Sequence, residues 1–353
     1  MSAERTLYFV IPGALDSPTG GYAYDRRIMA ELRLLGWHVE HVKLGDTFPL
    51  CEIADREHAH ACFAKFPDGA TVLVDGLAFG VLPEVAQAHC ARLRLFALVH
   101  HPLFMEEGIS PPIGEAYRAL EQKALNNCTA AITTSRQTAT TLREVFNVPV
   151  QKAFVVEPGT DLPSEISSRS ANGHLKLLCV GSLIPRKGQI LLLEALEQLQ
   201  SYDWELQLVG SLDFDRTYAE DVRKKLEQSG LAKRVSMLGA VNQPQLDILY
   251  RCADVFVLPS LYEGYGMAFT EALAHGLPII ASGEGAVRQT LPSDACLYFE
   301  ARDVEALRHH LQLIFEDPET RMRLAQAARA GARHLPTWTS AAQKLSKILE
   351  EPQ

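Results

Sequence analysis

Two glutamates flank a glycine-rich turn in the stretch SLYEGYGMAFTEALAHGLPIIAS, residues 260–282. Glu263 stands before the turn, and Glu271 lies in the helix expected to follow it. The free N–H groups and the dipole of a helix start bind anions, and glycines let a phosphate approach the backbone closely. We expect this anion site at Gly264, Tyr265, Gly266 and Met267. Because a carboxylate repels phosphate, each glutamate is suited instead to hydroxyl groups, which favours a ligand with sugar hydroxyls on either side of a diphosphate.

The alternative interpretation is that Glu263 and Glu271 are solvated surface acids, as most glutamates are. A second predicted strand, loop and helix, LLCVGSLIPRKGQILLLEAL, strengthens the ligand interpretation because its loop places Arg186 and Lys187 directly before Gly188. Two adjacent cations at the carboxyl end of a strand would neutralise a diphosphate in the same crevice. Taken alone, an Arg-Lys pair on a loop would be interpreted as two solvated surface residues.

A pair of histidines follows another predicted strand, in LFALVHHPLFMEEG. His100 and His101 lie side by side on a loop. The sequence pattern allows two interpretations, a functional role and a capping or packing role. Together with His58, His60 and Cys62 the two histidines offer ligand types that zinc accepts. The segment REHAHAC, however, is typical of an exposed helix face, so we expect no metal site.

The elements that must position these residues alternate between short apolar runs rich in Val, Ile and Leu and longer stretches of helical period, which indicates parallel sheets with crossover helices. The strands predicted in the first half are LYFVIP, HVEHVKL, TVLVDGL, RLFALVH, AAITTS and FVVEPG. Those predicted in the second half are LKLLCVGS, WELQLVGS, RVSMLGA, VFVLPS, PIIAS and CLYFE. A Ser-, Asn- and Gly-rich segment separates the series, so we predict two doubly wound α/β domains, a linker near residues 161–174, and ligands bound beyond the strand ends in the cleft between domains.

Length and composition limit the function classes. At 353 residues and 47% hydrophobic content, the chain is long enough for two domains. Its formal charge of −9 argues against a nucleic-acid groove, while peripheral membrane contact stays open. There is no apolar run of eighteen residues and no signal-peptide pattern, so we expect a soluble, cytoplasmic protein. The odd number of cysteines, seven, without a C-x-x-C pair, suits a reducing compartment and makes structural zinc improbable.

With these motifs in order, the chain resembles glycosyltransferase family 4, the retaining, nucleotide-sugar-dependent class with two facing Rossmann-like domains (the GT-B fold). The resemblance runs through LLCVGSLIPRKG, LQLVGS, VSMLGAV and LYRCADVFVLPSLYEGYGMAFTEALAHGLPIIAS, and extends to TGGYAYDRRIMAELRLLGWHV and VVEPGTD in the first half. One departure is Gln289 in GEGAVRQTL, where family members often carry a glutamate. The resemblance implies an acceptor-binding domain over residues 1–160, braced by a final helix over 337–353, and a nucleotide-sugar domain over 161–336.

The resemblance also implies roles for individual residues. Glu271 would hold the ribose hydroxyls and Glu263 the hydroxyls of the donor sugar, while Arg186 and Lys187 would bind the diphosphate. The amides that would add to the phosphate site belong to Tyr265, Gly266 and Met267.

In the first domain, Gly20 and Gly21 resemble the glycines that approach the diphosphate. His100 would lie by the donor sugar, although a slip of one residue would make it His101. The loop Leu238 to Val241 falls where the family contacts the nucleotide base. His100, Arg186, Lys187 and Glu263 are therefore the expected catalytic residues.

The implied reaction moves a sugar from a nucleoside diphosphate, UDP first and GDP next, to an acceptor hydroxyl with retention of configuration and without a metal or other cofactor. The acceptor, a small molecule, glycan or lipid-linked group, would meet first-domain loops that contain Phe79, Leu82, Phe104, Met105, Glu106 and Glu107. A nucleotide-sugar epimerase or phosphorylase of the same architecture explains the Arg-Lys-Gly loop and the glutamate pair less well. A non-catalytic nucleotide-sugar-binding module is the alternative from another class.

Overall fold

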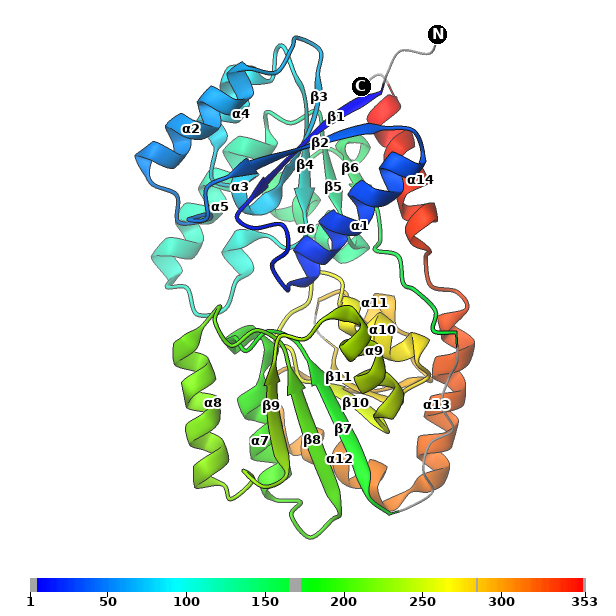
Figure 1. Ribbon diagram of the computed structural model, residues 1–353. Helices are drawn as coiled ribbons and strands as arrows, with labels where there is room; N and C mark the ends of the chain where they lie inside the picture. Colours follow the sequence, from blue (N-terminus) through cyan, green and yellow to red (C-terminus); the bar gives the residue numbers. More distant parts are fainter. Residues whose placement is uncertain (1–4, 165–172, 284, 352–353) are drawn as a thin grey trace. The chain divides into compact units, whose positions relative to one another are not determined.

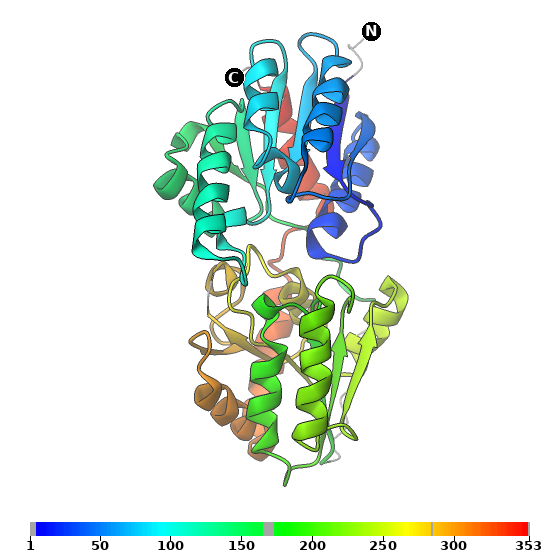
Figure 2. The same ribbon diagram turned by 90° about the vertical axis from the view of Figure 1, so that its left-hand side faces the viewer.

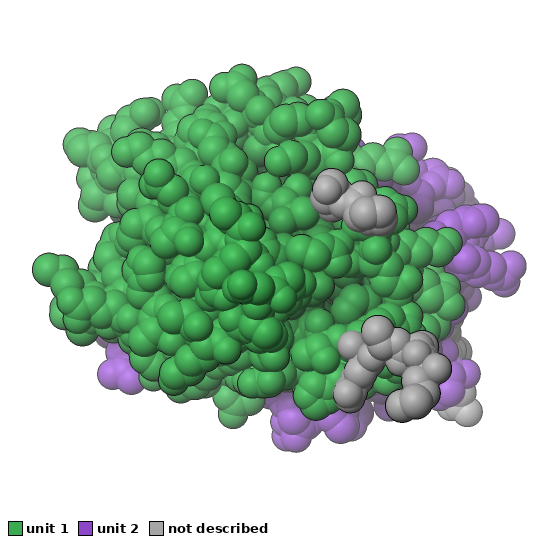
Figure 3. Space-filling view, turned by 90° about the horizontal axis from the view of Figure 1, so that it is seen from above, with its two compact units in different colours: residues 1–17, 21–159, 336–353 green, residues 18–20, 160–335 purple. Residues whose placement is uncertain are grey.

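The computed structural model describes residues 5–164, 173–283 and 285–351. These residues form two compact units, which Figure 3 shows in different colours. Unit 1 comprises residues 1–17, 21–159 and 336–353, and unit 2 comprises residues 18–20 and 160–335. We predicted a division between residues 160 and 161, and the units divide between 159 and 160. Part of the predicted linker, residues 165–172, lies outside the described residues.

Unit 1 is built on a parallel sheet in the order β2-β1-β3-β4-β5-β6, with helices on both faces (Figures 1 and 2). Its central strands read as nearly continuous apolar runs because both faces of the sheet are covered, and all five residues of TVLVD are buried. The strands are β1 (Thr6–Pro12), β2 (His38–Leu44), β3 (Thr71–Asp75), β4 (Arg94–Val99), β5 (Ala130–Thr133) and β6 (Ala153–Val155).

The main helices of unit 1 are α1 (Gly20–Leu34), α2 (Ile53–Ala64), α3 (Gly76–Phe79), α4 (Pro83–His89), α5 (Pro111–Leu125), α6 (Arg136–Phe146) and α14 (Trp338–Glu350). Helix α14 comes from the far end of the chain and packs beside α1 in both ribbon views. The ring of Trp338 lies edge-on to Tyr24, with centroids 5.8 Å apart, and the Trp37 indole N–H donates to Ser346 at 2.9 Å. The final segment of the chain is thus part of the first unit's structure.

Unit 2 contains a second parallel sheet, in the order β12-β11-β10-β7-β8-β9. The strands are β7 (Leu175–Val180), β8 (Trp204–Val209), β9 (Val235–Gly239), β10 (Val255–Leu258), β11 (Ile279–Ser282) and β12 (Cys296–Phe299). The main helices are α7 (Gln189–Glu197), α8 (Arg216–Gln228), α9 (Gln243–Cys252), α10 (Met267–Ala274), α11 (Val287–Thr290), α12 (Val304–Glu316) and α13 (Pro318–Ala332). Taken in chain order, the unit begins in the middle of its sheet at β7 and continues outward on one side before it returns to the other.

The twelve predicted strands are all confirmed, and each sheet has the order of a doubly wound fold. The segment TVLVDGL is shorter than predicted as a strand, because after Asp75 the chain turns directly into α3. None of the described helices combines the length and hydrophobicity needed to cross a membrane.

Candidate active site

The switch point of the second sheet brings two of the predicted loops together. Strands β7 and β10 are neighbours, although two strands separate them in the sequence, and the direction of winding reverses between them. Ligands of doubly wound sheets bind at this point, beyond the carboxyl ends of the strands. The loops that follow these two strands carry Arg186 and Lys187 on one side and Glu263 on the other.

These two loops are tied by backbone contacts. Gly188 has a φ of +66°, and a Cβ there would lie 2.2 Å from the Pro259 carbonyl oxygen, so only glycine allows the approach. The Leu261 N–H donates to the Arg186 carbonyl at 2.7 Å, and the Arg186 guanidinium donates to the Tyr262 carbonyl at 3.0 Å. The position of the cations is therefore fixed against the loop that carries the glutamate.

Glu263 is a buried acid, which excludes the interpretation as a solvated loop residue. Its side chain is 7% exposed, and one oxygen accepts from the Lys187 ammonium at 2.6 Å and from the Ser260 hydroxyl at 2.5 Å. Its other oxygen lies 3.8 Å from the Arg186 guanidinium. Burial alone would raise the pKa of Glu263, but the charges of Lys187 and Arg186 and the hydrogen bonds outweigh it and lower the pKa. The carboxylate is therefore ionised at neutral pH.

The glycine turn ends in a left-handed residue at the start of α10. Gly266 has a φ of +93°, and a Cβ there would meet the Phe269 ring at 2.8 Å. As the N-cap it has no side chain to bond the first amides of the helix, although its carbonyl accepts the Phe269 N–H at 2.9 Å. Tyr265 is buried, and Gly264 and Met267 are half-buried. The loop does turn into a helix at the predicted place, and the binding of an anion there stays a prediction.

Glu271 lies on α10 and is half-buried. One of its oxygens accepts from the Tyr250 hydroxyl at 2.9 Å. Tyr250 is in turn stacked on His275, with ring centroids 5.1 Å apart, and the His275 ring contacts Asp247 at 3.0 Å. Burial raises the pKa of Glu271 to about 7, and the charge of Asp161 adds to the effect, while the Tyr250 hydrogen bond opposes it. The carboxyl group thus titrates near neutral pH.

A cavity of about 410 Å³ opens at the carboxyl ends of β8 and β9 in the same unit. Its lining residues are Ser211, Leu212, Asp213, Arg216, Glu220, Arg223, Gly239 and Ala240. The predicted base-contact loop contributes its two central residues, whereas Leu238 is 41% exposed on β9 and Val241 packs partly against the core, so neither belongs to the lining. Contacts through the backbone of the inner residues remain consistent with the expectation.

We expected no metal partly on the ground that the chain lacks an Asp-x-Asp motif, and this is wrong, because Asp213 and Asp215 form such a pattern. Both carboxylates are engaged by protein groups. Asp213 accepts from Arg216 at 3.0 Å, and Asp215 caps α8 by accepting the Tyr218 N–H at 2.9 Å. These two aspartates therefore serve the turn before α8.

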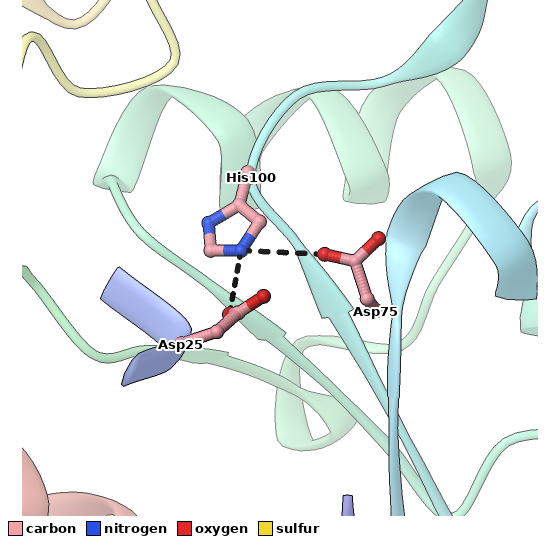
Figure 4. Close-up of side chains that lie close together, drawn as sticks. All are labelled: Asp25, Asp75 and His100. Carbon is pink, nitrogen blue, oxygen red and sulfur yellow. Dashed lines mark hydrogen bonds and ion pairs between the residues drawn. The ribbon is translucent and has the colours of Figure 1, made fainter. Parts of the chain in front are cut away.

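In unit 1, the structure distinguishes the two predicted histidines. The His100 Nε2 lies 3.1 Å from an Asp25 oxygen and 3.5 Å from an Asp75 oxygen (Figure 4). The His101 Nε2 instead lies 3.5 Å from Glu106. Asp25 and Asp75 were missed by the sequence analysis. An acid directly at the end of a buried strand could have indicated Asp75, but Asp25 precedes two arginines and resembles a surface residue.

Other first-unit predictions have mixed outcomes. Gly20 and Gly21 form the first turn of α1 and not a separate loop, and a Cβ on Gly21 would lie 3.4 Å from the His100 ring. Phe79 and Leu82 are buried in the core of unit 1, so the expectation that they serve an acceptor loop is wrong. Phe104 is partly buried against the same core, and Met105, Glu106 and Glu107 are half-buried on the segment before α5.

Within the described part of the chain, the His58, His60 and Cys62 set does not form a metal-type cluster. His58 Nε2 lies 3.6 Å from Cys62 Sγ on the mostly exposed α2. The group whose ligand atoms converge, all within 4.8 Å of one another, is Asp25, Asp75 and His100.

Comparison with known proteins identifies relatives of the chain and of its fold. Residues 164–331 match the family described as glycosyl transferases group 1. A D-inositol 3-phosphate glycosyltransferase of Corynebacterium efficiens is 27% identical over 257 residues, which are 68% of this chain and 60% of the relative. The matched segment thus spans less than two thirds of that relative's length.

Two solved structures share the whole architecture. A sucrose-phosphate synthase of Thermosynechococcus elongatus superposes with a TM-score of 0.78 at 22% identity, over 97% of this chain and 98% of that one. HepE of Anabaena, solved in complex with UDP and glucose, gives 0.76 at 18% identity, over 98% and 99% of the two chains. The fold is therefore GT-B, with two Rossmann-like domains, and the relatives are glycosyltransferases.

Proposed function

We propose that the chain is a retaining glycosyltransferase of family 4, of the hexosyltransferase type, that transfers a sugar from a nucleoside diphosphate sugar to an acceptor hydroxyl without a metal ion. UDP is the expected nucleotide, since HepE was solved with UDP, and GDP is the next candidate. The observation that carries the proposal is the group formed by the buried Glu263 and the partly buried Arg186 and Lys187 at the switch point of the second sheet. Such a position in a doubly wound sheet is where ligands bind.

Charge at this position suits a diphosphate. Arg186 and Lys187 contribute two positive charges and Glu263 one negative charge, so the group carries a net charge of +1. The start of α10 adds the partial positive charge of a helix dipole, about half an elementary charge. An ammonium group has three N–H donors, and its contact with Glu263 uses one of them. Lys187 can therefore bind a phosphate oxygen while it remains close to the glutamate.

The proposed chemistry depends on stabilising the leaving diphosphate. Negative charge grows on the phosphate oxygens as the sugar departs, and cations and amides fixed in advance lower the energy of that transition state. Glu263 is poorly suited to act as a covalent nucleophile, because one oxygen is held by Lys187 and Ser260 and the other faces Arg186. We therefore favour departure and attack on the same face of the sugar, with a leaving phosphate oxygen accepting the proton of the acceptor hydroxyl.

The nucleoside end would lie along the other elements of unit 2. Glu271, with Tyr250 holding one of its oxygens, has its second oxygen available for ribose hydroxyls. The cavity beside Gly239 and Ala240 is large enough for a nucleobase, and its backbone groups are suited to base recognition.

Nucleotide binding and transfer test the proposal separately. Calorimetry with UDP and GDP should give saturable binding, and Glu271→Ala should weaken it at least tenfold, since each lost charge-assisted hydrogen bond contributes about 1.5–3 kcal/mol. Glu227→Ala, an exposed glutamate of the same unit, is the matched control and should bind normally.

Incubation with a panel of UDP and GDP sugars, followed by NMR of the anomeric proton, should show hydrolysis or transfer with retained configuration. If neither nucleotide binds at millimolar concentration, the proposal fails. If binding occurs without turnover of any sugar, the chain is a binding module.

A further inference from the structure

Three ionisable side chains converge at the carboxyl end of the first sheet, and our proposed function assigns a role to only one of them. Asp75 ends β3, His100 directly follows β4, and Asp25 lies in the second turn of α1 (Figure 4). The side chains of Asp25 and Asp75 are 0% and 3% exposed, and that of His100 is 21% exposed. Burying two carboxylates this deeply is costly unless a proton or cation accompanies them.

The histidine is the group that can compensate both carboxylates. Its Nε2 faces an oxygen of each aspartate, so that an N–H at this atom would lie between them. The other Asp75 oxygen accepts the Leu77 N–H at 2.8 Å, whereas Asp25 Oδ2 has no hydrogen-bond partner in the described part of the chain. Any effect of the Asp25 charge on a bound ligand would therefore be transmitted by His100.

Other charged or titratable groups near the cluster compensate it less directly. The Arg26 guanidinium donates to the carbonyls of Leu15 and Ser17, and its charge reaches Asp25 only at a distance. Burial lowers the pKa of His41, so this neighbour of Asp25 is mostly neutral. Tyr22 also faces the acids, and burial together with their charges raises its pKa, so its phenol stays protonated.

The titration of the cluster agrees with a shared proton. Burial raises the pKa of Asp25 and, to about 7, that of Asp75. Burial alone would lower the pKa of His100, but the two aspartates outweigh it and raise the pKa. Positive charge on the imidazole is thus favoured at neutral pH.

The ring is also fixed in its orientation. Tyr24 packs edge-on against it with centroids 5.2 Å apart, and Gly21 lies beside the ring, where a Cβ would be 3.4 Å from it. Figure 4 shows the second ring nitrogen, Nδ1, on the side away from both aspartates. With Nε2 committed to the acids, Nδ1 is the atom that can meet a ligand.

We propose that Asp25 and Asp75 are positioning residues that hold His100 as an imidazolium with Nε2–H directed inward, so that Nδ1–H is a charged hydrogen-bond donor to an oxygen of the sugar donor. The part of this inference that concerns the sugar donor rests on the proposed function. A neutral histidine with the same Nε2–H would have a lone pair at Nδ1 and could only accept a hydrogen bond. The two aspartates therefore decide whether the residue donates or accepts.

Nitrogen-15 labelling of the histidines tests the inference without reference to activity. Two-bond ¹H–¹⁵N spectra distinguish imidazolium from either neutral tautomer, and His100→Gln identifies the signal among the 12 histidines. We expect His100 in the wild-type protein to be doubly protonated at pH 7. Asp25→Asn should lower the midpoint of its titration by about 1–3 pH units, because an opposite charge at this distance has that effect. Asp75→Asn should act in the same direction and provides a second variant if the first does not fold.

Glu121→Gln is the matched control. Glu121 is another buried acid of unit 1, with a pKa that burial raises to about 7, but it accepts the N–H groups of Leu103 and Phe104 and does not face His100. This variant should leave the His100 titration unchanged. In kinetics, the alkaline limb of the kcat/KM profile should move to lower pH in Asp25→Asn and stay in place in Glu121→Gln.

Several results would overturn the inference. A neutral His100 at pH 7 in the wild-type protein would do so, as would a titration that Asp25→Asn and Asp75→Asn leave unmoved. A His100 signal that changes when a chelator is added to the purified protein, and returns with zinc, would identify a metal site in place of the shared proton. An imidazolium in a protein without transferase activity would refute the proposed function and leave the assignment of the aspartates standing.

Discussion

The ion pair of Lys187 and Glu263 is expected to contribute both to the stability of unit 2 and to the transfer reaction. A double-mutant cycle can separate these two contributions. We consider Lys187→Met, which keeps the aliphatic stem that packs over Gly181 and removes the charge. The variant leaves the carboxylate of Glu263, 7% exposed, with the Ser260 hydroxyl and a guanidinium 3.8 Å away. Removing one partner of a buried ion pair costs about 3–5 kcal/mol. Because Arg186 compensates in part, we expect a loss near the lower end of that range.

The double variant Lys187→Met/Glu263→Gln removes both charges and should be more stable than Lys187→Met alone. Replacing a whole buried ion pair by neutral groups is often close to neutral in stability, since no uncompensated charge remains. The losses of the two single variants should therefore not add. The control is Lys224→Met, whose partner Asp221 lies 3.2 Å away with both side chains at least half exposed, and it should cost at most about 1 kcal/mol.

Stability should be read in unit 2 alone, because a protein of two units does not unfold in a single step. Hydrogen exchange measured by mass spectrometry on peptides from β7 and β10 provides that reading. Transferase activity should stay roughly 100- to 1,000-fold below that of the wild type in the double variant, since the cation that we propose for the leaving diphosphate is still absent. Additive stability losses would show that Lys187 and Glu263 are not a coupled pair, and near-normal turnover in the double variant would show that Lys187 has no part in the chemistry.

Three further predictions concern Glu271, Gly21 and metal. Because the folded pKa of Glu271 is raised to about 7, the site holds the neutral acid below that pH, and UDP affinity should fall by about tenfold per pH unit as the pH drops below 7. Calorimetry on Glu271→Gln should lack this dependence beyond what the phosphate itself contributes. Gly21→Ala should be tolerated, since a Cβ would lie 3.4 Å from the His100 ring, whereas the larger Gly21→Val should displace the ring and lower the transfer rate with little effect on UDP affinity. EDTA should leave transfer largely intact, because in the proposed mechanism protein cations and helix amides neutralise the diphosphate.

Each of these predictions has a result that contradicts it. If UDP affinity depends on pH equally in the wild type and in Glu271→Gln, the protonation of Glu271 does not affect UDP binding. Normal turnover in Gly21→Val would show that the first turn of α1 tolerates bulk beside His100. An absolute requirement for manganese or magnesium would overturn the metal-free account.

The fold was predictable because its signal is local. The central strands are short apolar runs that both faces of a parallel sheet bury, the edge strands β2 and β9 alternate between buried and more exposed residues, and each loop after a strand is marked by glycine, proline or charge. The site residues that the sequence indicated, such as Lys187 and Glu271, lie in those marked loops or in the helix after one. The apolar periodicity and the turn residues were therefore sufficient to predict the strands, the helices and the loops that carry the site residues.

The partners of those residues were not predictable, because they depend on strand order. Lys187 and Glu263 are 76 positions apart and meet only because β7 and β10 are neighbours in the sheet. His100 and Asp25 are 75 positions apart and meet through the packing of α1 on the first sheet. Apolar periodicity specifies which residues form strands but not which strands pair. The burial of Glu263 was missed for the same reason, since its compensating charge comes from a distant loop.

The pairing of Glu263 with Lys187 also bears on how an acidic chain can bind an acidic ligand. The protein has a formal charge of −9, which on average repels a nucleoside diphosphate. At the two loops, however, one carboxylate lies beside one guanidinium and one ammonium group. The local net charge is therefore positive in spite of the acid. Without Glu263 the two cations would repel each other in a largely buried position, and their positions would be less well fixed. The glutamate therefore lowers the cost of keeping both cations where the diphosphate would bind, and it is also placed to accept hydroxyl groups of a sugar attached to that diphosphate.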